Sequence, residues 1–118
     1  MLKKEKEALQ SLLDLDEGSR YIGEIALISH DSPISNMNIL FYNTLFDENA
    51  SCHMALGRAY PMNVKNGLTM KMDELEKIGY NNSMNHVDFM FGSSDLKIVG
   101  TKQNDEQVVI FEKGNFVI

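Results

Sequence analysis

The 118-residue sequence contains only one cysteine, Cys52, which excludes an internal disulfide and gives no sign of an oxidising compartment. It also lacks an apolar run long enough to span a bilayer, a glycine-rich phosphate loop, and a basic cluster with interleaved aromatic residues. The N-terminal stretch "MLKKEKEALQ" has no apolar segment of the kind that secretory signals need. We therefore expect a cytoplasmic protein that does not contact membranes.

Basic residues are in the minority: 11 lysines and arginines stand against 17 aspartates and glutamates, for a net charge of −6. That balance argues against a nucleic-acid surface and against an anionic membrane surface. The composition is 43% hydrophobic and 24% charged, which is ordinary for a soluble globular protein. Residues 1–118 are long enough for a single domain with a modest core.

The hydrophobic pattern predicts an α/β or α+β fold, in which flanking helices cover a mixed β-sheet. "HDSPIS" has the composition of a loop, whereas "NILFYNTLF" fits either a helix or a strand. The last two strands predict a terminal hairpin with the turn "QNDE". We expect helices near 2–15 and 72–78, and strands near 24–29, 52–57, 86–91, 96–102 and 107–112.

The stretch "NHVDFMFG" is mostly apolar and predicts a buried strand, yet it carries His86 and Asp88 two residues apart. Alternate residues of a strand point to the same face, so an imidazole and a carboxylate stand side by side. They form a ready pair of metal ligands, because a metal ion would compensate the buried carboxylate. The alternative is that Asp88 accepts backbone hydrogen bonds and His86 is satisfied by protein partners.

Three further residues are candidates for the same chemistry. Glu24 is placed at the start of a strand by the turn at Gly23, where carboxylates often line a site; a solvated acid is the alternative. His53 lies among small apolar residues and needs partners for both ring nitrogens, which a metal or two protein hydrogen bonds could supply. Tyr60 could donate to an oxyanion or could simply pack. Two carboxylates and two imidazoles suit zinc, cobalt or manganese, although no HExxH helix is present.

Four blocks of the sequence resemble the signature motifs of the thermophilic-type metalloaminopeptidases. They are "GEIALIS", "SPIS", "FYNTLFDENASCHMALGRAY" and "NNSMNHVDFMFGSSDLKIVG", and the resemblance runs from about Asp16 to the C-terminus. Enzymes of this family bind two divalent metal ions through two glutamates, two histidines and an aspartate. The resemblance implies metal ligands at Glu24, His53, His86 and Asp88, with Glu24 and the active-site tyrosine Tyr60 in catalytic roles.

The family's other ligand glutamate lies upstream of the "GE.AL" block, in a part that this chain lacks together with the N-terminal domain. The resemblance therefore implies that residues 1–118 are the C-terminal metal-binding part of such an enzyme. The implied reaction removes N-terminal residues from peptides with a free N-terminus, by means of a metal-activated water, and a homodimer is implied as well. The alternative is a catalytically inactive remnant that binds metal or dimerises.

Overall fold

The computed structural model describes residues 3–118, which form two compact units. The first unit contains the chain up to Ile25 together with Met54–Phe89, and the second contains Ala26–His53 and Met90–Ile118. The helices are α1 (Lys3–Leu13), α2 (Pro33–Met37), α3 (Thr44–Glu48) and α4 (Met72–Lys77), with short 3-10 turns at Glu17–Arg20, Pro61–Asn63 and Gly67–Thr69. The strands are β1 (Ile22–Ala26), β2 (His53–Gly57), β3 (His86–Met90), β4 (Ile98–Thr101), β5 (Gln107–Glu112) and β6 (Asn115–Phe116).

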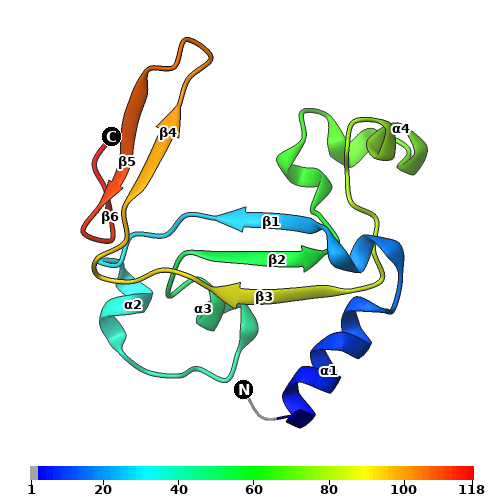
Figure 1. The fold of residues 1–118 in the computed structure, drawn as a ribbon, viewed down its shortest axis with the longest axis horizontal. Helices are drawn as coiled ribbons and strands as arrows, with labels where there is room; N and C mark the ends of the chain where they lie inside the picture. The colour runs from blue at the N-terminus through cyan, green and yellow to red at the C-terminus, as the bar shows by residue number, and fades with distance from the viewer. Residues whose placement is uncertain (1–2) are drawn as a thin grey trace. The chain divides into compact units, whose positions relative to one another are not determined.

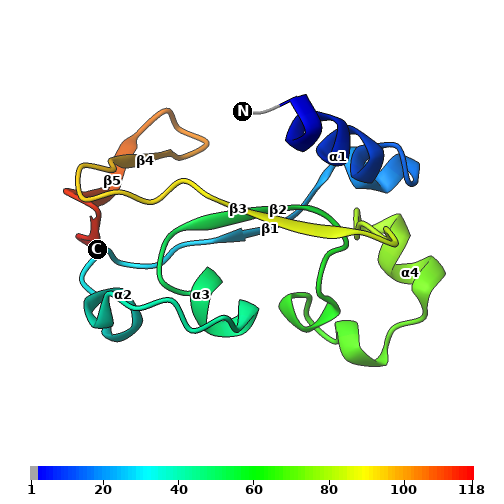
Figure 2. The ribbon, with the colours of Figure 1, turned by 90° about the horizontal axis from the view of Figure 1, so that it is seen from below.

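The first sheet has the order β1-β2-β3, so β2 is its central strand and both other strands are edges. Figure 1 shows that neighbouring strands of this sheet run in opposite directions, and Figure 2 shows the three strands as one twisted layer. The sheet belongs to the first unit, apart from the strand-end residues Ala26, His53 and Met90, which belong to the second.

The second sheet has the order β4-β5-β6 and lies in the second unit. β4 and β5 are antiparallel and form the predicted hairpin, whose turn places Asp105 at a positive φ of 61°. β6 was not predicted; it pairs with β5 through Lys113 and Gly114, which have φ values of 49° and 73°. Two consecutive residues at positive φ are what a tight hairpin turn requires, so "KG" was the signal for this strand.

The helix at 72–78 is confirmed as α4. Asp73 and Glu74 lie in its first turn and Lys77 in its last, which suits the helix dipole. The Glu74 carboxylate also accepts a hydrogen bond from the backbone N–H of Lys71 at 2.8 Å. The predicted helix 2–15 is observed as α1, with Leu2 outside the described residues, and α1 has no buried side chain. No helix within residues 3–118 is both long enough and apolar enough to cross a bilayer.

The α/β character of the fold is confirmed, but the strands form two antiparallel sheets where we expected one mixed sheet. The physical reason is that β3 leaves the first sheet at Met90, and β4 and β5 then satisfy their backbone groups through a local hairpin. The first strand begins at Ile22, two residues earlier than expected.

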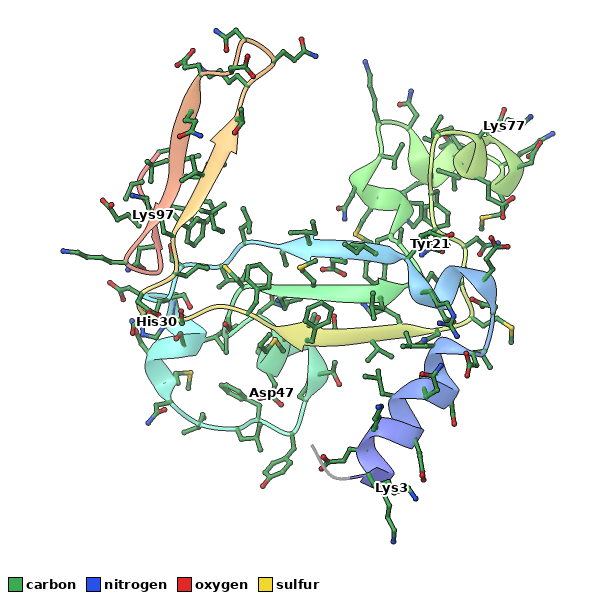
Figure 3. All side chains as sticks on the ribbon, viewed as in Figure 1. Lys3, Tyr21, His30, Asp47, Lys77 and Lys97 are labelled. Carbon is green, nitrogen blue, oxygen red and sulfur yellow. The ribbon has the colours of Figure 1, made fainter. Side chains whose placement is uncertain are left out.

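The structure also decides the two segments that lie between the first two predicted strands. "HDSPIS", predicted as a loop, contains the start of the short helix α2, because the side chain of Ser32 caps this helix and Pro33 occupies its first turn. "NILFYNTLF" is irregular until α3 begins at Thr44. The Asp47 carboxylate accepts the backbone N–H groups of Phe41 and Asn43 and thereby holds this turn, at the position labelled in Figure 3.

Few side chains are fully buried in either unit. In the first unit the buried apolar side chains are Ala55, Leu75 and Tyr80, and in the second they are Cys52 and Phe111. Cys52 is 1% exposed, and its thiol donates to the carbonyl of Ile28 at 3.2 Å. His30 is on the surface.

Candidate metal centre

Three of the predicted ligands come together in the first unit. Glu24 is the third residue of β1, and His86 and Asp88 are the first and third residues of β3. β2 lies between these strands, which places β1 and β3 about 9–10 Å apart. The Glu24 and His86 side chains nevertheless meet, so both project from one face of the sheet and reach over β2.

The imidazole of His86 is the centre of this cluster. Its Nε2 lies 3.5 Å from Oε2 of Glu24 and 3.4 Å from Oδ1 of Asp88. One ligand atom from each of the three residues lies within 4.8 Å of the other two. The three side chains are only 15–21% exposed, so water screens their charges incompletely. The separation of Asp88 and His86 confirms that they share one strand face.

These separations fit a metal ion. Nitrogen and oxygen ligands lie about 2.1 Å from zinc, so two ligands of a tetrahedral site are about 3.4 Å apart. Both distances from the His86 Nε2 agree with that value. Two carboxylates and one imidazole also have the ligand chemistry that zinc, cobalt and manganese accept.

The buried oxygen of Asp88 supports the same interpretation. Asp88 Oδ1 is the only buried side-chain nitrogen or oxygen atom in the described residues that lacks a hydrogen-bond partner. A buried acceptor without a partner loses its hydration and receives nothing in return, which is costly for a carboxylate. Because this oxygen points at the His86 Nε2, a cation bound by the two atoms would compensate the charge of the carboxylate and would accept the lone pair of the imidazole.

A backbone carbonyl sets the tautomer of His86. Its Nδ1 lies 2.7 Å from the carbonyl oxygen of Arg58, and a carbonyl only accepts, so Nδ1 carries the hydrogen. In the neutral ring Nε2 is then the acceptor, with its lone pair toward the two carboxylates. Without a cation, the Nε2 lone pair and the two carboxylates repel each other. The hydrogen bond from Nδ1 to a backbone carbonyl is the second-sphere contact typical of histidines that bind metals.

Tyr60 contacts the same histidine. The two ring centroids lie 5.1 Å apart, and the ring planes are inclined by 54°. Tyr60 is 43% exposed, so its phenol borders the cluster from an accessible position. The predicted active-site tyrosine therefore lies next to a predicted ligand.

His53 opens β2 and belongs to the second unit. It is 1% exposed, in agreement with its position among small apolar residues in the sequence. Its Nδ1 donates to the carbonyl oxygen of Ser51 at 2.9 Å, so its neutral ring also has Nε2 as the acceptor nitrogen. Both predicted histidine ligands thus have the same tautomer, each fixed by a backbone carbonyl.

A profile of the thermophilic metalloprotease (M29) family matches residues 2–116. The chain belongs to the thermophilic metalloprotease family. It is 53% identical over 110 residues to aminopeptidase 2 of Geobacillus stearothermophilus, and 52% identical over 114 residues to aminopeptidase AmpS of Bacillus subtilis (strain 168). These alignments include 93% and 97% of this chain, but 27% and 28% of the two relatives.

Structure comparison agrees with this membership. Wild-type AmpT from Thermus thermophilus superimposes with a TM-score of 0.84 at 39% identity, over 98% of this chain and 28% of that chain. The chain therefore spans little more than a quarter of the length of these thermophilic metalloproteases. Membership implies a divalent metal, and the Glu24, His86 and Asp88 cluster is a possible site for it.

One expectation about this part of the metalloprotease chain was wrong, and one contact was missed. The strand with His86 and Asp88 is not buried: β3 is an edge strand, so Phe89 and Met90 are 43% and 49% exposed. The carbonyl of Arg58 was missed because a backbone acceptor carries no side-chain signal in the sequence.

Proposed function

We propose that this chain is the metal-binding part of a metal-dependent aminopeptidase that hydrolyses N-terminal residues from peptides. The observation that carries the proposal is the convergence of Glu24 and Asp88 on the acceptor nitrogen of His86. The similarity to proteins named aminopeptidases supports the reaction class. Peptides with a free N-terminus are accordingly the proposed substrates, and the homodimer stays a prediction.

In this proposal Glu24, His86 and Asp88 hold a divalent ion, and the role of His53 as a further ligand stays a prediction. Zinc, cobalt and manganese all suit this set of imidazole and carboxylate groups. A bound metal would lower the pKa of a water molecule and polarise the scissile carbonyl. The Arg58 carbonyl keeps the His86 ring oriented while Nε2 is engaged.

The catalytic roles fall to Glu24 and Tyr60. A carboxylate that lies at the ligand cluster can accept the proton that the attacking water loses, and Glu24 is within 3.5 Å of the His86 imidazole. The Tyr60 hydroxyl can donate a hydrogen bond to the oxyanion that develops on the substrate carbonyl. Its ring contact with His86 places that hydroxyl beside the ligands.

Metal binding is tested first, on the 118-residue chain. Zinc or cobalt is titrated after treatment with a chelator, and affinity is measured by calorimetry and metal analysis. We expect His86→Ala to weaken binding by at least about 100-fold, the upper end of what the loss of an outer-sphere partner costs. His30→Ala is the matched control, because His30 is an exposed histidine outside the cluster. Equal affinities in the unmodified chain and His86→Ala would refute the site.

Activity is tested in a chimera, because the chain matches 28% of AmpS. The corresponding 114 residues of AmpS are replaced by this chain, and release of the chromophore from leucine p-nitroanilide is followed with added cobalt or zinc. We expect hydrolysis that is lost in Glu24→Gln. A folded chimera that binds metal without hydrolysing this or other N-terminal anilides would favour the alternative, a catalytically inactive metal-binding remnant.

A further inference from the structure

The first unit contains a carboxylate, Asp16, that takes no part in the ligand cluster. Its Oδ1 accepts the backbone N–H of Ser19 at 2.8 Å and the hydroxyls of Ser19 and Ser83, both at 2.9 Å. Its Oδ2 accepts the backbone N–H of Met84 at 2.7 Å. A helix cap needs only the Ser19 contacts. The other two attach this carboxylate to the segment that leads directly into β3.

Ser83 extends this hydrogen-bond network toward His86. Ser83 is 2% exposed, and its hydroxyl donates to Asp16 and accepts the backbone N–H of Asn85 at 3.1 Å. The carbonyl of Asn85 accepts the backbone N–H of Arg58 at 2.6 Å. Arg58 in turn offers the carbonyl that receives the His86 Nδ1–H at 2.7 Å. Four successive hydrogen bonds therefore join the Asp16 carboxylate to the His86 ring.

The backbone is shaped to allow this arrangement. Gly57 has a φ of 99°, and a Cβ on it would lie 2.1 Å from the carbonyl oxygen of Asn85. The side chain of Asn85 is buried and donates to the Leu12 carbonyl at 3.2 Å, which holds the same residue from another side. Because Asn85 immediately precedes His86, any shift of its peptide moves the carbonyl partner and the imidazole together.

We propose that Asp16 is a positioning residue for His86: through Ser83, Asn85 and Arg58 it keeps Nδ1 protonated and directs Nε2 toward Glu24 and Asp88. The metal-binding consequence rests on the proposed function, whereas the tautomer does not. A structural cap predicts a different result. It would affect only the stability of the unit and would leave the His86 ring unchanged at temperatures where the chain is folded.

Substitution of two buried serines distinguishes a positioning role of Asp16 from a purely structural capping role. Ser19 and Ser83 both donate to Asp16 Oδ1 at 2.9 Å, but only Ser83 accepts from Asn85. In metal-free chain at about pH 9, well above the ordinary histidine pKa of about 6.5, ring nitrogen resonances report the tautomer of each histidine. The spectrum of His86→Ala assigns the His86 signals among the three histidines. We expect Ser83→Ala to raise the Nε2-protonated fraction of His86, and Ser19→Ala to leave it unchanged.

Zinc affinity provides the second measurement. Ser83→Ala is expected to weaken zinc binding by on the order of 10-fold, as loss of an outer-sphere partner does, and Ser19→Ala is expected to bind as the unmodified chain does. Asp16→Asn keeps a good cap but turns an amide toward the Met84 N–H, so it should behave like Ser83→Ala. Asp95→Asn is the control, because Asp95 is another serine-bonded aspartate but lies in the second unit.

The outcomes are distinguishable. If Ser83→Ala and Ser19→Ala lower the unfolding temperature without moving the His86 ring signals, Asp16 is only a cap and the proposal is wrong. Equal changes in the two serine variants would also overturn it, because the link through Asn85 would then be irrelevant. If the ring signals shift as expected but the unmodified chain binds no zinc, the positioning role holds and the proposed metal function fails.

Discussion

Replacing Asp88 by asparagine should make the metal-free protein more stable and remove its response to metal. Asp88 holds a negative charge near that of Glu24, on an oxygen without a hydrogen-bond partner. Asparagine has the same shape and no charge. Its amide can donate to the Glu24 carboxylate or to the His86 Nε2, which lies 3.4 Å from the position of Oδ1.

The size of the effect follows from the separation of the charges. Ligand oxygens of Asp88 and Glu24 lie within 4.8 Å of each other. Two like charges at that distance repel by about 0.9 kcal/mol in bulk water and by about 3.5 kcal/mol at an effective dielectric constant of about 20. Both side chains are mostly covered, at 15% and 21% exposure. We therefore expect Asp88→Asn to raise the free energy of unfolding by about 1–3 kcal/mol in chelator.

Metal should cancel most or all of this difference in stability. A ligand at 100 times its dissociation constant stabilises the folded state by about 2.7 kcal/mol, which amounts to roughly 10 °C in unfolding temperature for a chain of this size. The unmodified chain should gain this amount with zinc, whereas Asp88→Asn should gain almost none at the same concentration. Unfolding curves with chelator and with zinc, recorded at low salt in alkaline buffer where ordinary histidines are neutral, measure both differences.

Asp105→Asn is the matched control. It makes the same change of charge in the exposed β4–β5 turn, where Asp105 has a positive φ that asparagine tolerates well. It should therefore keep the full response to zinc. The reasoning is refuted if Asp88→Asn is less stable than the unmodified chain in chelator, or if zinc stabilises it as much as it stabilises the control.

Two further predictions concern the approach to β3. Gly57→Ala should cost more than the roughly 1–3 kcal/mol of a residue held in a sparsely populated conformation, because its Cβ would also meet the Asn85 carbonyl. Gly79→Ala is the control, since Gly79 has a φ of 93° but open space around it; equal losses in urea unfolding would show that the close contact is unimportant. The Met84 N–H, then the Ser83 and Ser19 hydroxyls, lower the pKa of Asp16 from 3.8 to about 2. Stability from the ionised Asp16 should thus be complete above about pH 3.8 and fall toward pH 2, and Asp16→Asn should flatten this decline while Asp105→Asn keeps it.

Local patterns predicted the elements whose interactions are local. Helix α4 was found from its charge placement, and the β4–β5 hairpin from two apolar runs that flank a polar turn. The division of the strands into two sheets was not found, because strand order depends on pairings between distant parts of the chain. α2 was missed for a different reason: five residues give no periodic pattern, and only the Ser32 cap and Pro33 mark it.

The cluster of Glu24, His86 and Asp88 was predictable in part. The spacing of His86 and Asp88 fixes a common face on any strand, and the structure confirms it at 3.4 Å. That Glu24 joins them depends on an antiparallel sheet with β2 in the centre, which periodicity does not specify. The groups that hold the His86 ring could not be predicted. Of the four hydrogen bonds that link Asp16 to the His86 ring, one joins two backbone groups and one has a backbone carbonyl as its acceptor, and such groups leave no signal in the sequence.

The register of the two edge strands determines whether the cluster exists. A slip of one residue would turn His86 and Asp88 to the opposite face of the sheet from Glu24. Two glycines let neighbouring backbone segments approach closely near these residues. A Cβ on Gly23 would lie 2.1 Å from the Gly57 carbonyl, and a Cβ on Gly57 would lie 2.1 Å from the Asn85 carbonyl. A larger residue at either position would push one strand away from β2. The glycines, together with the hydrogen bonds that lead to Asp16, thus align the side chains of Glu24 and His86, which are 62 residues apart in the chain.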